Sequence, residues 1–79
     1  MTSNNEFEYD LGVVGLGYVG LPLAVESSNQ GLKVIGYDIN PERVEMINNG
    51  ISPIEDISND ELSNALNNFN STLNSELLS

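Results

Sequence analysis

The stretch GLGYVG, Gly15 to Gly20, decides the fold of this chain. It places three glycines in the spacing G-x-G-x-x-G, between an apolar run at residues 11–14 and a segment with helical spacing at residues 18–30. Gly15 permits a tight turn after a strand, Gly17 lets the backbone approach a pyrophosphate, and Gly20 lets the helix pack closely on the strand. The stretch therefore predicts a strand–turn–helix unit whose main-chain amides bind a diphosphate. A glycine-rich turn without a ligand is the alternative.

The segment after the first helix repeats the alternation of strand and helix. Residues 33–37 (KVIGY) are typical of a second strand, and Asn40-Pro41 indicates the start of a second helix, with Asn as N-cap and Pro at the first helical position. Gly31 and Gly50 are expected to end the two helices. Residues 51–57 are expected to form a loop.

A third helix is predicted behind Ser58-x-x-Glu61, which has the spacing of a capping box. The apolar positions after it follow one helical face, for which core packing is the simplest role: Leu62, Ala65, Leu66 and Phe69. Residues 70–79 are weak in every pattern.

Strands that alternate with helices imply parallel pairing and right-handed crossovers. The predicted class is therefore α/β and incomplete Rossmann-like, the β-α-β-α start of a doubly wound parallel sheet. Residues 1–9 are expected to be a disordered N-terminal segment, and residues 10–79 a partial, truncated NAD-binding domain. In such a sheet the first strand normally lies in the middle. Here it is expected to leave an open edge.

Asp38 supports the nucleotide interpretation by its position. It lies 18 positions after Gly20, at the end of the second predicted strand. A carboxylate there can accept hydrogen bonds from the adenosine ribose hydroxyls and would repel a 2′-phosphate, so NAD is preferred over NADP. An ordinary turn residue is the alternative for Asp38. Arg43, in the first turn of the second helix, can pack on the adenine, reach the ribose edge, or be a solvated surface arginine.

Composition narrows the classes of function. The 79 residues include 12 acidic and 2 basic side chains, for a net charge of −10, and contain neither histidine nor cysteine. A typical zinc site and a Ser-His-Asp triad are thereby excluded, and no metal site is predicted. Nucleic acid and anionic membranes are not expected as partners, because the chain repels their phosphates. The acidity fits either a partly disordered protein or one adapted to high salt, and the regular patterning of the first half favours the second.

No apolar run approaches the length of a membrane span, and no basic segment precedes one. A cytoplasmic location is therefore expected.

Four motifs, GLGYVGLPLA, VIGYDINPERVEMINNG, SPIED and ELSNAL, resemble the N-terminus of the UDP-glucose/GDP-mannose dehydrogenase family. The SPIED loop is most similar to members that oxidise UDP-N-acetylhexosamines. The resemblance implies NAD-dependent oxidation of a nucleotide-sugar C6 alcohol to a carboxylate in two hydride transfers. It also implies cofactor contacts from the backbone at Tyr18 and Val19, from the Asp38 carboxylate and from Arg43. FNSTLNSEL is similar to a degraded form of the family's short third strand and the helix start after it.

The family's catalytic groups have no counterpart here. The resemblance implies a cysteine that forms a thiohemiacetal with the aldehyde intermediate, and a lysine beside it. This chain has no cysteine, and its one lysine, Lys33, begins a predicted strand. No catalytic residue is therefore predicted, and the nucleotide sugar is expected as a ligand only if a second chain completes the site.

Three interpretations stay open at this level. The first is the NAD-binding N-terminal fragment of a nucleotide-sugar dehydrogenase, from a truncated or split gene. The second is a non-catalytic module that binds an adenine nucleotide or pairs with the missing half of the dehydrogenase. The third is a non-functional remnant.

Overall fold

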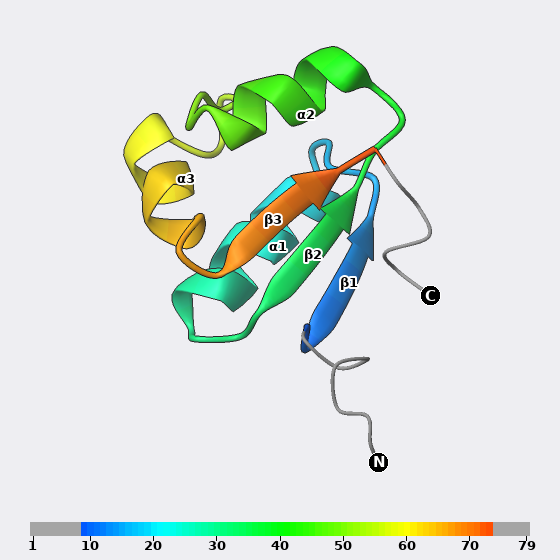
Figure 1. Ribbon diagram of the computed structural model, residues 1–79. Coiled ribbons are helices and arrows are strands. Elements are labelled where there is room, and N and C mark those ends of the chain that lie inside the picture. The colour runs from blue at the N-terminus through cyan, green and yellow to red at the C-terminus, as the bar shows by residue number, and fades with distance from the viewer. Residues whose placement is uncertain (1–8, 74–79) are drawn as a thin grey trace.

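The computed structural model describes residues 9–73 of the 79 and forms a three-stranded parallel sheet with three helices (Figure 1). The strand order is β1-β2-β3, and the register places Val13 beside Gly36 and Gly36 beside Ser71. The α/β class and the parallel pairing are thereby confirmed. In chain order the elements are β1 (Leu11–Val14), α1 (Gly20–Asn29), β2 (Val34–Tyr37), α2 (Pro41–Asn48), α3 (Asn59–Ala65) and β3 (Phe69–Thr72).

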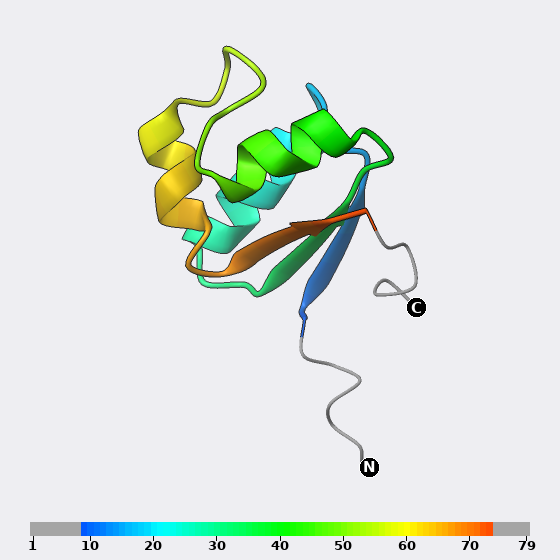
Figure 2. The same cartoon turned by 45° about the horizontal axis from the view of Figure 1, so that its top comes forward.

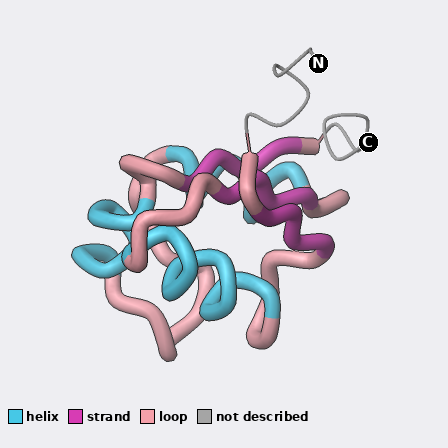
Figure 3. The backbone as a smooth tube through the Cα atoms, turned by 90° about the horizontal axis from the view of Figure 1, so that it is seen from below, coloured by secondary structure: helices cyan, strands magenta, loops and turns pink. Residues whose placement is uncertain are grey.

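The helices cover one face of the sheet. In Figure 2 all three lie above the strands, which lie side by side in Figure 1, and Figure 3 shows the backbone from below. Residues of the three strands that point to this face pack with apolar residues of the helices in one core. The core contains Val13, Val34 and Phe69 from the strands, and Leu21, Ala24, Val25, Ile47, Leu62 and Ala65 from the helices. None of the helices in residues 9–73 is long and apolar enough to cross a membrane.

Two glycines end α1 and α2, as the sequence predicts. Gly31 has a φ of +102° and Gly50 a φ of +78°, which side chains with a Cβ rarely adopt. Each donates its N–H to a carbonyl of the last turn, and the next residue donates to the carbonyl before that one. This is the Schellman arrangement, which pairs carbonyls that the helix itself leaves free.

Both predicted N-caps are present. The Asn40 side chain accepts hydrogen bonds from the amides of Glu42 and Arg43, with Pro41 at the first helical position. Ser58 and Glu61 form the reciprocal bonds of a capping box at α3. The structure thus starts both helices at the residues that the sequence indicates.

The expected extent of the third helix is wrong at its end. The helix ends at Ala65 with Leu66 as C-cap, and Phe69 belongs to β3 rather than to the helical face. Phe69 pairs with Val34 in the sheet and is buried. The periodicity misled because a strand residue at the right distance fills the same core as the helix. The short third strand that the family resemblance implies is confirmed. The disorder expected for residues 1–9 concerns residues that, apart from Tyr9, lie outside the described part.

Candidate functional site

The glycine loop lies between β1 and α1, at the carboxyl end of the sheet. Gly15 has a φ of +88°, and its N–H donates to the Tyr37 carbonyl at 2.8 Å. A Cβ added to Gly20 would lie 1.6 Å from the Gly15 carbonyl oxygen. The first glycine is therefore needed for the backbone conformation and the third for the close approach of helix and turn.

Gly17 has neither requirement. Its φ lies outside the left-handed region, and the nearest atom to an added Cβ is the Arg43 Nη1 at 3.9 Å. The fold therefore has room for a Cβ at this position. The space over Gly17 is a place where a ligand can approach the backbone closely.

The backbone after Gly17 offers donors to such a ligand. The amides of Gly17, Tyr18, Val19 and Gly20 have no partner among residues 9–73, whereas Leu21 donates to the Gly17 carbonyl. These four amides lie at and just before the N-terminal end of α1, where the helix dipole favours negative charge. The side chains of Tyr18 and Val19 are exposed. The arrangement suits a diphosphate held by main chain alone.

The buried side chain of Leu16 anchors the glycine loop in the core. This side chain is fully buried, and it lies against Gly36 of β2, where an added Cβ would be 2.7 Å from the Leu16 Cδ2. Sequence reasoning assigned no role to either residue. The available signal was an apolar residue between two glycines and a glycine inside a predicted strand, a position that often marks a close approach.

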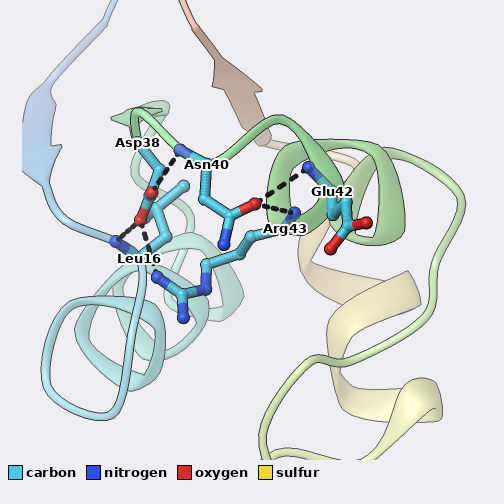
Figure 4. A network of polar contacts seen from close by, with 5 residues as sticks. All are labelled: Leu16, Asp38, Asn40, Glu42 and Arg43. Atoms are coloured by element: carbon cyan, nitrogen blue, oxygen red, sulfur yellow. Dashed lines mark hydrogen bonds and ion pairs between the residues drawn. The ribbon is translucent and has the colours of Figure 1, made fainter.

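Asp38 points toward the loop. Its Oδ2 accepts a hydrogen bond from the Leu16 amide at 2.7 Å, and its Oδ1 accepts one from the Asn40 amide at 2.9 Å (Figure 4). Arg43 approaches Oδ2 with Nη1 at 3.2 Å. The loop and the two residues that sequence reasoning placed after it, Asp38 and Arg43, therefore meet in one cluster.

The environment of Asp38 favours the ionised form. Burial by itself would raise the pKa of Asp38. The hydrogen bonds from the Leu16 and Asn40 amides and from Arg43, together with the positive charge of Arg43, outweigh that effect and hold the pKa below its ordinary value. Asp38 is thus an anion at neutral pH.

An open hollow of about 540 Å³ runs along the loop and the free side of β1. Its lining comprises Gly12, Val13, Val14, Gly15, Gly17, Tyr18, Val19, Gly20 and Leu23. A smaller hollow of about 200 Å³ lies between Tyr9, Lys33 and residues 66–70. It contains none of the residues just described. Among residues 9–73, no cluster of acidic side chains is arranged to hold a metal ion.

The residues present fit a dinucleotide. Free amides at a helix N-terminus match a diphosphate, the bare backbone at Gly17 leaves room for it, and the Asp38 carboxylate at the end of β2 matches a ribose diol.

Comparison with known proteins gives consistent matches. The NAD binding domain of the UDP-glucose/GDP-mannose dehydrogenase family matches residues 9–77. Protein CapL of Staphylococcus aureus is 42% identical over 67 residues, which cover 85% of this chain and 15% of CapL. The solved structure of UDP-D-ManNAc dehydrogenase from Pyrococcus horikoshii is similar with a TM-score of 0.79 and 36% identity, covering 87% of this chain and 17% of that one.

A third relative is GDP-mannose dehydrogenase from Pseudomonas aeruginosa, solved as a ternary complex. It gives a TM-score of 0.75 at 33% identity and covers 81% of this chain and 15% of that chain. The chain therefore spans only about a sixth of the length of these relatives.

Proposed function

Because the chain belongs to the UDP-glucose/GDP-mannose dehydrogenase family and carries its NAD-binding domain, we propose that it is the NAD-binding N-terminal segment of a nucleotide-sugar 6-dehydrogenase. NAD, when bound, supplies the acceptor for a hydride from the sugar alcohol. The chain's own part is to bind the adenosine diphosphate half. The similarity to UDP-N-acetyl-D-mannosamine dehydrogenases supports a UDP-N-acetylhexosamine as the sugar substrate of the complete enzyme.

The proposed contacts follow from the cluster. The amides of residues 17–20 donate to the diphosphate, and the Asp38 carboxylate accepts from the ribose. Gly15 and Gly20 hold the loop in shape, and the guanidinium of Arg43 borders the ribose position. A 2′-phosphate beside the Asp38 carboxylate would be repelled, which favours NAD over NADP.

The observation that carries this proposal is the glycine at position 17. Neither backbone conformation nor internal packing requires a glycine there, since an added Cβ finds only ordinary contact at 3.9 Å. Room for a ligand is the remaining physical reason for it.

Replacing Gly17 by Ala and by Val tests the site. We expect the affinity for NAD to fall stepwise with side-chain size, by about tenfold or more for Gly17→Val, because the side chain fills the space of the diphosphate. Isothermal titration with NAD in molar salt measures it, and circular dichroism checks that both variants keep the wild-type fold. Gly20→Ala is the contrasting variant, expected to lose the fold as well because of its clash with Gly15. Equal affinity of wild type and Gly17→Val would refute the site.

We further propose that oxidation of the sugar needs residues that this chain lacks. The sequence contains no cysteine for the thiohemiacetal step that the family resemblance implies. A polypeptide with the remaining strands of a nucleotide-sugar dehydrogenase is proposed to join at β1, whose outer side has no partner strand among residues 9–73. Val14, Val19 and Leu23 are exposed along that side, and a parallel sheet is normally covered on both faces.

Co-purification tests this pairing. A polypeptide with the remaining strands of a nucleotide-sugar dehydrogenase, expressed with this chain, is expected to elute with it and to restore tight NAD binding. Leu23→Lys should weaken the association, because it places a charge in the apolar contact. Ile51→Lys is the matched control, since Ile51 is exposed to a similar extent (47% against 51%) but lies away from β1. Equal loss from both variants would contradict pairing at this edge.

The proposed setting is the cytoplasm, without nucleic-acid or membrane partners. The net charge of −10 and the absence of a membrane-spanning helix among residues 9–73 support it.

A further inference from the structure

The Asp38 carboxylate is already engaged before any ligand arrives. It accepts three hydrogen bonds within the protein, from the Leu16 amide, the Asn40 amide and Arg43 (Figure 4). A carboxylate offers about four lone-pair positions, so most of its capacity is used internally. A residue that only recognised a ribose would not need these bonds.

The bond to Leu16 is the shortest of the three, at 2.7 Å, and it is buried. It joins residues 22 positions apart, from the loop after β1 and from the end of β2. Hydrogen bonds to an ionised group are stronger than those between neutral groups. This contact therefore ties the glycine loop to the neighbouring strand.

A hydrogen bond to the Leu16 amide is well placed to orient the glycine loop. The Leu16 side chain is held in the core against Gly36, so its amide is the remaining part of the residue to be oriented. The four unpartnered amides follow directly after it, at residues 17–20. The orientation of the Leu16 peptide thus sets the direction in which these amides begin.

We propose that Asp38 is a positioning residue for the glycine loop: through the Leu16 amide it holds the loop in its binding shape before the cofactor arrives. This deepens the proposed function and rests on it. A preformed loop loses less conformational entropy on binding. Asp38 therefore contributes to the affinity for the diphosphate without touching the diphosphate.

The chain offers a matched control for this role. Asp10 makes the same kind of contact, because its Oδ2 accepts a hydrogen bond from the Lys33 amide at 3.0 Å at the opposite end of β1 and β2. Asp10→Asn and Asp38→Asn therefore are the same substitution and remove the same charge. Arg43→Gln removes the ion pair but leaves the Leu16 bond in place.

The test is amide hydrogen exchange by NMR on the 79-residue chain without NAD, followed by titration with NAD. We expect Asp38→Asn to speed exchange at Leu16 by about tenfold or more. The Leu16 and Asn40 amides donate to different oxygens of Asp38, whereas an asparagine has one oxygen and an NH2 group that cannot accept, and any bond that remains loses the negative charge of its acceptor. Asp10→Asn and Arg43→Gln are expected to leave Leu16 exchange within about twofold of wild type.

A wild-type measurement covers the case in which Asp38→Asn fails to fold. The Leu16 amide proton shift is expected to titrate together with the Asp38 carboxyl carbon. A Leu16 amide that ignores this titration, or exchange unchanged in a folded Asp38→Asn, overturns the positioning role even if NAD affinity falls. If protection of the Leu16 amide depends on Asp38 but the chain binds no NAD, the proposed function is contradicted, while the hydrogen bond between Asp38 and the loop is supported.

Discussion

The three glycines of the loop meet three different needs, as the motif predicts. Gly15 supplies a positive φ, Gly20 avoids a clash with the Gly15 carbonyl, and Gly17 is free of both demands. Gly15 and Gly20 are therefore structural, whereas a change at Gly17 separates an effect on binding from an effect on folding. Gly36 is also structural, because an added Cβ there would clash with Leu16 and Phe69 in the core.

Asp38 is expected to give the chain a particular acid sensitivity. Its pKa is lowered in the folded state, so the stability it contributes is present above its ordinary value of 3.8 and is lost as the pH falls through the folded-state pKa. Urea unfolding over a pH series should show a wild-type loss of stability on acidification that Asp38→Asn lacks. At neutral pH the variant should be less stable by about 1.5–3 kcal/mol, the range for hydrogen bonds to a charged group. Parallel curves for the two proteins would contradict this.

At the scale of elements, the caps decide where helices begin and end. The N-caps of α2 and α3 are Asn40 and Ser58, whose side chains accept hydrogen bonds from amides of the first turn. The α3 helix has 7 residues, so its propensity contributes little and its cap and its two buried residues, Leu62 and Ala65, matter more.

Ser58→Ala tests the capping box of α3. The variant should lose about 1 kcal/mol of unfolding free energy, because the Glu61 amide loses its acceptor. Thermal or urea unfolding measures the loss. Ser63→Ala, the same substitution at an exposed position inside the helix, should be neutral or slightly stabilising. Equal losses in both variants would show that the box has no special weight.

At the scale of the whole molecule, repulsion between acidic side chains opposes the stability that a small hydrophobic core provides. The 79 residues carry a net charge of −10, and the described acidic side chains are mostly exposed. Added salt shortens the range of their mutual repulsion, from about 10 Å at 0.1 M to about 3 Å at 1 M. The acidic composition therefore favours a protein that is most stable at high salt.

We expect the thermal midpoint of unfolding to rise from low to molar KCl, as measured by circular dichroism. A triple variant, Glu45→Gln, Glu55→Gln and Asp56→Asn, changes exposed residues for which no hydrogen bond or ion pair is present in the described structure. It should be more stable than wild type at low salt and should gain less from KCl, because repulsion is already reduced. An equal salt response in both proteins would assign the effect to something other than charge. A coil spectrum at all salt concentrations would support the non-functional remnant instead.

The sequence by itself determined the α/β class, the strands β1 and β2 and the N-caps of α2 and α3. It also singled out Asp38 and Arg43, which the structure brings together beside the glycine loop, while their contacts with a cofactor stay a prediction. These follow from local rules, since caps, turns and a glycine spacing act within a few residues. For Phe69 the helical spacing and the family resemblance pointed to different elements, and the structure places it in β3. Only the tertiary structure decided that the Leu16 side chain lies against Gly36 and that the Asp38 carboxylate accepts a hydrogen bond from the Leu16 amide. These contacts join residues 20 or more positions apart and depend on how the strands pair, which the local pattern does not specify.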